Sequence, residues 1–280
     1  MSTTVSHPIP ARGNLFHRTS MLLGHPAMQA LAKTRVALFG VGGVGSWAAE
    51  ALVRSGVEHL LLVDSDCICS TNVNRQIQAT ALNTGMSKVE ALRLRLLEIN
   101  PHAAIATHHG AYNEHTANQF TLAEFDYVLD AIDSLKNKVL LIQRTLEAGV
   151  PLYASMGAAA KLDPTLVRVA PLAKTRICPL ARMVRKRLHR LGVPCDFPCV
   201  YSEEMPLTPA AESLCGTGRC ACSRKPTGAT KGDGDSADPD WCALKRQING
   251  TVVHVTAVFG LTLASLVIRD IAGKHPPRQA

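Results

Sequence analysis

The sequence predicts an α/β fold built on a doubly wound, mainly parallel sheet with helices on both faces. Short apolar runs alternate with longer segments of helical periodicity through the first 150 residues. A glycine-rich turn joins the first apolar run to a helix, and a carboxylate closes the next run. The 280-residue chain is long enough to bury one large core. We therefore expect a Rossmann-like domain followed by a C-terminal extension of strands and helices.

The first 13 residues are polar and hold two prolines, so we expect a mobile N-terminal arm there. A helix is expected to follow, ending at about residue 33. No continuous apolar run opens the sequence, which argues against a secretory signal and favours a cytoplasmic location. An apolar fraction of 46% argues against disorder, and the net charge of +8 favours a polyanionic partner.

Residues 36–39 form a short apolar run that leads directly into the pattern G-x-G-x-x-G. Glycines in such a turn let the backbone bend tightly and approach phosphate oxygens, and the following helix, starting near Ser46, offers unpaired N–H groups to an anion. A nucleotide site is favoured over a merely structural turn. The glycines expected to bind it are Gly40, Gly42, Gly43 and Gly45.

Asp64 ends the apolar run of residues 59–63, where a carboxylate can accept hydrogen bonds from ribose hydroxyls. More polar groups follow than a dinucleotide requires, which favours a triphosphate. They are Asp66, Asn72, Asn74, Arg75 and Lys88.

Lys88 falls in the first turn of a helix expected over residues 87–100, where Ser87 and Glu90 match an S-x-x-E capping box. The helix dipole disfavours a cation there by a few tenths to about 1 kcal/mol. An anion beside Lys88 would offset that cost. The alternative is that the Lys88 side chain reaches away into solvent.

Further strands and helices are expected in the order 104–107 strand, 113–120 helix, 127–132 strand and 134–147 helix. Parallel strands bring their carboxyl ends to one edge, so the glycine turn, Asp64 and Asp133 are expected to share one crevice. Asp130 lies inside an apolar run, and a buried carboxylate needs a partner, so a structural role is weighed equally with catalysis.

These segments resemble the ubiquitin-activating-enzyme-like adenylyltransferases, which include enzymes of the molybdopterin and thiamin pathways. GVGGVGSWAAEAL, VDSD, TNVNRQ and DAIDS occur in the order of that family. The branch that the sequence resembles most is the tRNA threonylcarbamoyladenosine dehydratases, through Ser46-Trp47, PLAKT at 171–175 and VTAVFG at 255–260. The resemblance extends over residues 16–271.

The resemblance implies an enzyme that cyclises threonylcarbamoyladenosine beside the tRNA anticodon, by adenylation of its carboxylate and intramolecular ring closure. ATP and Mg²⁺ would be the cofactors, and the assembly a homodimer, with a sulfur-relay or cysteine desulfurase partner left open. Adenylation of the C-terminal glycine of a ubiquitin-like sulfur carrier is the alternative in the same chemistry. A nicotinamide-dependent oxidoreductase and a non-catalytic RNA-binding relative are alternatives of other classes.

Individual roles also follow from the resemblance. Asp133 matches the family's magnesium-associated aspartate. Arg18 matches the second arginine of R-x-x-R, which reaches phosphates in the partner subunit's site, whereas Leu15 replaces the first arginine and removes one expected contact. The expected catalytic residues are thus Arg18, Arg75, Lys88 and Asp133. Residues 14–280 would form one domain, with a nucleotide-binding part at 14–150 and a substrate and dimer part at 151–202 and 246–280.

Two more strands are expected at 152–155 and 166–170, and a basic stretch without acidic residues then runs from 173 to 194. Leu180, Val184, Leu188 and Leu191 recur at helical spacing, so an apolar stripe can dock while basic side chains project outward. We expect this face to track tRNA phosphates, with a merely solvated surface as the alternative. The residues expected to contact tRNA are Lys174, Arg176, Arg182, Arg185, Lys186 and Arg190.

The nine cysteines are expected to be reduced thiols, because the sequence shows no export signal. Cys178 precedes a predicted helix, and we favour a structural role for it over that of a nucleophile. Residues 203–245 are expected to form a flexible loop rather than a zinc site, because its cysteines lack C-x-x-C pairs. These are Cys215, Cys220, Cys222 and Cys242.

The apolar run at 252–268 is shorter than the ~20 residues of a membrane span. We expect a buried strand or helix that closes the core, with a role as a dimer face and peripheral membrane contact both left open.

Overall fold

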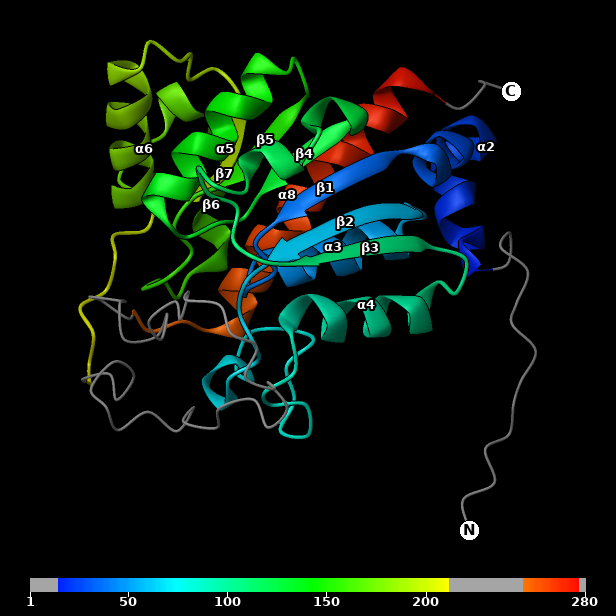
Figure 1. Cartoon of the computed structure of the whole chain (residues 1–280), viewed down its shortest axis with the longest axis horizontal. Helices are drawn as coiled ribbons and strands as arrows, with labels where there is room; N and C mark the ends of the chain where they lie inside the picture. Colours follow the sequence, from blue (N-terminus) through cyan, green and yellow to red (C-terminus); the bar gives the residue numbers. More distant parts are fainter. Residues whose placement is uncertain (1–14, 212–248, 277–280) are drawn as a thin grey trace.

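The computed structural model describes residues 15–211 and 249–276. Seven strands form one sheet in the order β3-β2-β1-β4-β5-β7-β6 (Figure 1). All neighbouring strands are parallel except β6, which runs antiparallel to β7. The chain steps outward from β1 to β3 and then returns to β4 on the other side of β1, so the strand order reverses between β1 and β4. The predicted doubly wound fold is confirmed.

The strands are β1 (Arg35–Phe39), β2 (His59–Asp64), β3 (Ala104–His109), β4 (Tyr127–Asp130), β5 (Leu152–Ser155), β6 (Val167–Pro171) and β7 (Pro198–Ser202). The α-helices are α2 (His17–Lys33), α3 (Gly45–Arg54), α4 (Lys88–Ile99), α5 (Leu135–Glu147), α6 (Pro179–Arg190) and α8 (Val253–Lys274). Short 3-10 turns occupy Ser70–Asn72, Ala117–Gln119, Leu122–Glu124, Pro164–Leu166 and Leu172–Lys174.

Two hydrophobic cores lie on opposite faces of the sheet. Val36 and Leu38 of β1 join the core formed with α3, α4 and α8. Ala37 and Phe39, which alternate with them, join the core formed with α5 and α6. A strand buried on both faces reads as a continuous apolar run, which is why β1 could be recognised in the sequence.

The helix expected over residues 113–120 is wrong, since only the short turn Ala117–Gln119 forms there. The side-chain oxygen of Asn113 accepts hydrogen bonds from the backbone N–H groups of His115 and Thr116, at 2.9 and 3.2 Å. Side-chain bonds of this kind satisfy the backbone locally and compete with helix formation.

Helix α8 is longer than expected, because it runs for 22 residues from Val253 to Lys274. Its length and mean hydropathy of 1.7 are those of a possible membrane span, but half of its apolar segment is buried within the protein. Phe259, Leu263 and Val267 are fully buried, and Gly260 allows α3 to pack closely. These side chains belong to the core that α8 shares with α3, so the expected role of closing the core is confirmed.

Cys67, Cys178, Cys195 and Cys199 are free thiols, as expected. Cys69 is disulfide-bonded, which corrects the expectation of a reduced thiol at that position. The expected N-terminal arm and most of the cysteine-containing loop, with its four cysteines, lie outside the described residues.

Candidate active site

The candidate site lies at the carboxyl edge of the sheet, where the strand order reverses. Gly40 follows β1 and donates its N–H to Val63 of β2 at 2.8 Å, and Ala131, after β4, donates to Phe39 of β1 at 2.8 Å. The segment from Ala131 leads directly to the exposed Asp133. The structure therefore brings the glycine turn, Asp64 and Asp133 to one edge, as the topology predicted.

Gly40 and Gly45 are required by close backbone packing. Gly40 has φ +87°, and a Cβ atom there would lie 2.7 Å from the carbonyl oxygen of Ala131. A Cβ atom at Gly45 would lie 1.8 Å from the carbonyl oxygen of Gly40. Beside Gly42, by contrast, the nearest group is a glutamine side chain 3.9 Å away, which leaves the backbone accessible to a ligand.

Val41, at the apex of the turn, is held from both sides. Its N–H donates to Asp64 Oδ2 at 2.8 Å, and its carbonyl oxygen accepts from Gln78 Nε2 at 2.8 Å. The other carboxylate oxygen of Asp64 accepts from the N–H of Asp66 at 2.8 Å. Burial raises the pKa of the Asp64 carboxyl above its ordinary value, and the nearby Lys88 opposes that shift. Asp64 thus shapes the glycine turn.

Lys88 is buried and forms an ion pair with Asp66, with Nζ 2.5 Å from Oδ2. Burial alone would lower the pKa of its ammonium, but the charges of Asp64, Asp66 and Asp133 together raise it above its ordinary value. The anion that a cation in the first turn of α4 requires is therefore present, and the solvated alternative for Lys88 is wrong.

The predicted capping box at the start of α4 is wrong. Ser87 makes no capping hydrogen bond, and its buried hydroxyl finds no partner among the residues that the structure describes. Glu90 is paired instead with Arg93, one turn further along the helix. An ion pair across one turn holds the glutamate away from the helix N-terminus.

The loop after β2 brings Asn72 and Arg75 to the same region in different ways. Asn72 is buried, and its side-chain oxygen accepts from Cys69 N at 2.9 Å, so it shapes the loop. Arg75 is half-buried, and its guanidinium donates to Thr71 O and Asn74 Oδ1, both at 2.9 Å. Its aliphatic carbons lie 3.2–3.3 Å from the Cβ position of a residue placed at Gly43. Arg75 therefore borders the glycine turn.

Asp130 and Asp133 differ in environment, as expected. Asp130 is fully buried, pairs with Lys138 at 2.7 Å and accepts from the N–H of Ile132 at 3.0 Å. Burial raises the pKa of the Asp130 carboxyl, against the opposing charge of Lys138. The structural role weighed for Asp130 is confirmed, which leaves the exposed Asp133 as the carboxylate that a ligand can reach.

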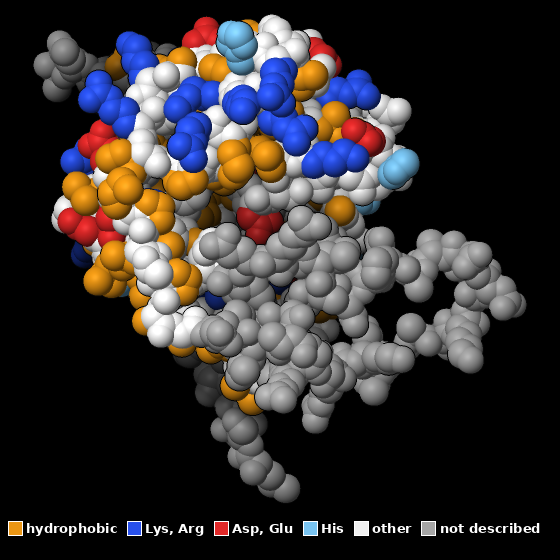
Figure 2. Space-filling view, turned by 90° about the vertical axis from the view of Figure 1, so that its left-hand side faces the viewer, with side chains coloured by type: hydrophobic (Ala, Val, Ile, Leu, Met, Phe, Trp, Pro, Cys, Tyr) orange, Lys and Arg blue, Asp and Glu red, His pale blue; other side chains and the backbone are white. Residues whose placement is uncertain are grey.

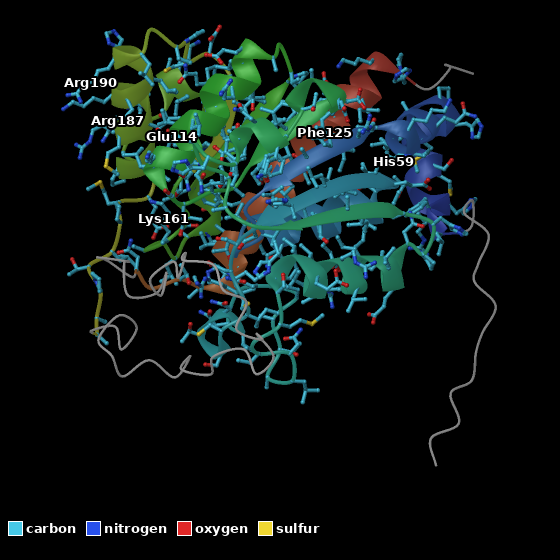
Figure 3. All side chains as sticks on the ribbon, viewed as in Figure 1. His59, Glu114, Phe125, Lys161, Arg187 and Arg190 are labelled. Atoms are coloured by element: carbon cyan, nitrogen blue, oxygen red, sulfur yellow. The ribbon has the colours of Figure 1, made fainter. Side chains whose placement is uncertain are left out.

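Arg18 is not brought to this site. It lies in the first turn of α2, and Phe16, two residues earlier, packs near Gly56 in the loop that precedes β2. That loop belongs to the amino edge of the sheet, where Figure 3 labels His59 at the start of β2. The exposed Arg18 is therefore at the opposite end of the strands from the glycine turn of its own chain.

The basic helix α6 exposes most of the side chains expected to face RNA. Arg182, Lys186 and Arg190 are exposed, as are Lys174 and Arg176 in the preceding segment. Figure 2 shows Lys and Arg side chains gathered on one face of the molecule, and Figure 3 shows Arg187 and Arg190 pointing away from it.

Two predictions for α6 are wrong. Arg185 turns inward and donates to the carbonyl oxygens of Leu172 and Thr175 at 3.1 and 2.9 Å, and to the Thr175 hydroxyl. Spacing alone could not distinguish it from its exposed neighbours, because its partners lie before the helix. Leu191 is 55% exposed instead of docked, since α6 ends at Arg190.

Comparison with known proteins gives the family. The ThiF family model matches residues 16–280. The chain belongs to the ThiF family.

Within the ThiF family, the chain is 41% identical over 192 residues to the tRNA threonylcarbamoyladenosine dehydratase of Bacillus subtilis, covering 69% of this chain and 76% of that protein. It is 34% identical to the Escherichia coli enzyme of the same name over 92% of this chain and 94% of that protein. A crystal structure of the E. coli enzyme with AMP matches with TM-score 0.78 and 31% identity, covering 96% of this chain and 98% of that one. Another, with ATP, matches with TM-score 0.77.

Gln78 is the residue of this ThiF-family site that the sequence did not reveal. Its side chain is buried and holds the Val41 carbonyl, while its own backbone carbonyl accepts from Asn83 Nδ2 at 2.7 Å. It follows the TNVNRQ motif by two positions, but a glutamine in a polar loop carries no pattern that predicts a contact 37 residues away. Only the fold identifies it.

Proposed function

We propose that this chain is an ATP-dependent tRNA threonylcarbamoyladenosine dehydratase. The carboxylate of threonylcarbamoyladenosine attacks the α-phosphate of ATP and pyrophosphate leaves. A nucleophile in the same side chain then attacks the acyl-adenylate, the ring closes and AMP leaves. The protein contributes positioning and charge stabilisation.

The observation that carries this proposal is the buried Lys88, whose charge is balanced by Asp64 and Asp66 beside an accessible glycine turn. Such a cation is suited to the phosphates of a nucleoside triphosphate, whereas a dinucleotide does not call for it. In the proposal the glycine turn holds phosphates, Asp64 faces the ribose, and Asn72 and Arg75 complete the triphosphate site.

Asp133 is proposed to hold Mg²⁺ together with phosphate oxygens. Asp133 is exposed at the carboxyl edge of the sheet and is close enough to Lys88 to contribute to the raised pKa of that lysine. Within residues 15–211 and 249–276 no cluster of three or more His, Cys, Asp or Glu could hold a metal ion alone. This fits Mg²⁺, which is commonly held by one or two carboxylates and the substrate phosphates. When bound, the ion would neutralise phosphate charge.

A homodimer is part of the proposal, because Arg18 lies at the far edge of its own sheet and can serve only the site of a second copy. The exposed basic residues of α6 and of the segment before it would contact tRNA phosphates. We place this reaction in the cytoplasm, with α8 packed in the protein core.

The proposal is tested with purified protein, ATP and tRNA carrying threonylcarbamoyladenosine. We expect AMP release and loss of one water from the nucleoside, measured by mass spectrometry, with no AMP from tRNA that lacks the modification. No turnover with modified tRNA would refute it. AMP-forming exchange stimulated by a ubiquitin-like carrier protein and not by tRNA would select the alternative.

A further inference from the structure

Lys161 lies in an unusual backbone environment beyond the carboxyl end of β5. The residue before it, Ala160, has φ +58°, and the residue before Cys178, Ile177, has φ +64°. Among the described residues these are the two non-glycine residues with positive φ. Such backbone is strained, most of all for a β-branched residue, and strain of this kind clusters at functional sites. The two turns place Lys161 near Cys178, whose thiol acts to raise the pKa of the Lys161 ammonium.

Hydrogen bonds and packing contacts connect this segment with the glycine turn through the start of α8. Ala160 donates its N–H to Gly250 O at 2.9 Å, and the carbonyl oxygen of Leu162 lies 2.8 Å from His254 Nε2. Two residues further along α8, Thr256 Cβ lies 3.4 Å from the Cβ position of a residue placed at Gly43. Figure 3 shows Lys161 at the end of the molecule opposite His59, the end that carries the glycine turn.

The Lys161 ammonium is buried without an ion pair in the part of the chain that the structure describes. The residue is 4% exposed, and within the described residues its ammonium donates one hydrogen bond, to the backbone carbonyl of Glu204 at 2.6 Å. The Glu204 carboxylate does not pair with this ammonium but accepts hydrogen bonds from the N–H groups of Leu162 and Asp163 at 2.8–3.0 Å. Burial lowers the pKa of Lys161 below its ordinary value, and the smaller influences of Cys178 and Glu204 oppose this.

The charge of a buried lysine without an ion pair is costly, so the lysine either loses its proton or binds an anion. Lys88, in contrast, has its counter-charges within the protein and keeps its proton. Lys88 is therefore suited to phosphates, whereas Lys161 is suited to accept a proton.

We propose that Lys161 is the general base of the ring-closing step. This rests on the proposed function. The neutral amine takes the proton from the attacking N–H or O–H group of the substrate side chain as that atom bonds to the acyl carbon. The bond from the acyl carbon to the AMP oxygen breaks, and AMP leaves with that electron pair. The ammonium then returns its proton to water.

The test separates adenylation from ring closure. With modified tRNA, Lys161→Met is expected to keep substrate-dependent ATP–pyrophosphate exchange within about threefold of the wild-type rate, while ring closure falls by roughly 10²–10⁴-fold, as for loss of a general base. The acyl-adenylate accumulates in single-turnover experiments. Lys33→Met, which removes an exposed lysine at the amino edge, is the matched control and leaves both rates unchanged.

Two further variants identify the role. Lys161→Arg keeps a cation that cannot act as a base, so it should be as slow as Lys161→Met and lose the wild-type rise of ring-closure rate with pH. Lys161→Ala should be partly rescued by an added primary amine, and this measurement decides the matter if the methionine variant does not fold. Near-normal ring closure in Lys161→Arg, or loss of exchange together with cyclisation, overturns the proposal. If wild-type protein makes neither AMP nor the cyclised nucleoside, the proposed function itself fails.

Discussion

The ammonium of Lys138 lies 2.7 Å from the carboxylate of Asp130, and both side chains are fully buried. Lys138 belongs to α5 and Asp130 ends β4, so the pair connects a helix to the strand that leads to Asp133. Asp130 also accepts from the N–H of Ile132. The pair therefore fixes the segment that presents the proposed magnesium ligand.

Removing one partner of this pair should be strongly destabilising. Lys138→Met leaves the Asp130 carboxylate buried and unpaired, and we expect a loss of about 3–5 kcal/mol in the free energy of unfolding by urea titration. Lys136→Met, on the same helix, removes an exposed pair with Glu114 and should cost about 1 kcal/mol or less. A change in Lys138→Met as small as that in the control would contradict the structural role.

Gly40→Ala is expected to abolish ATP binding, because its Cβ would lie 2.7 Å from the Ala131 carbonyl oxygen while the backbone is at φ +87°. Gly85→Ala is the matched control. Its φ is +94° but nothing lies within 4 Å of its Cβ position, so it should cost only about 1–2 kcal/mol of stability and keep ATP affinity. Calorimetric titration with ATP measures both, and equal affinities would show that the turn tolerates a side chain.

The sequence predicted those parts of the site that depend on local pattern. Gly40 and Asp64 could be placed because a buried strand, a glycine turn and a strand-ending carboxylate are each visible within a few residues. The prediction of a capping box at Ser87 was wrong because Glu90 is paired with Arg93. The S-x-x-E spacing does not reveal whether the glutamate binds the helix N-terminus or a nearby arginine.

Residues that depend on distant contacts could not be predicted. Gln78 meets Val41 and Lys161 meets Glu204 only after the chain has folded. Arg182 and Arg185 are the same residue type, three positions apart on one helix. Arg182 is exposed, whereas Arg185 donates to the Leu172 and Thr175 carbonyls. Tertiary packing decides such cases.

That difference gives a test of the basic helix. The triple variant Arg182→Ala, Lys186→Ala and Arg190→Ala should weaken tRNA binding and reduce the slope of log affinity against log salt by about two to three, because each phosphate contact releases counterions. Arg185→Ala should leave the slope nearly unchanged and instead lower stability by about 1–3 kcal/mol, since it removes hydrogen bonds from a charged group. Filter binding at several salt concentrations and urea unfolding distinguish the two effects. An unchanged slope in the triple variant would mean that α6 is only a solvated surface.

Arg18 provides the test of a site shared between two copies. In one chain it lies at the amino edge of the sheet, near Phe16 and Gly56, while Lys88 lies at the carboxyl edge. If Arg18 completes the partner's site, Arg18→Ala and Lys88→Ala should each be inactive as homodimers. A mixed dimer would carry both lesions in one site and none in the other.

Unfolding and refolding the two variants together should then restore up to about a quarter of the wild-type AMP release, for random pairing in a two-fold dimer. Each variant refolded alone is the control and stays inactive. If the mixture gains nothing while wild-type protein survives the same treatment, Arg18 does not act across a dimer interface, because a shared site must recover when an intact half is supplied by each chain.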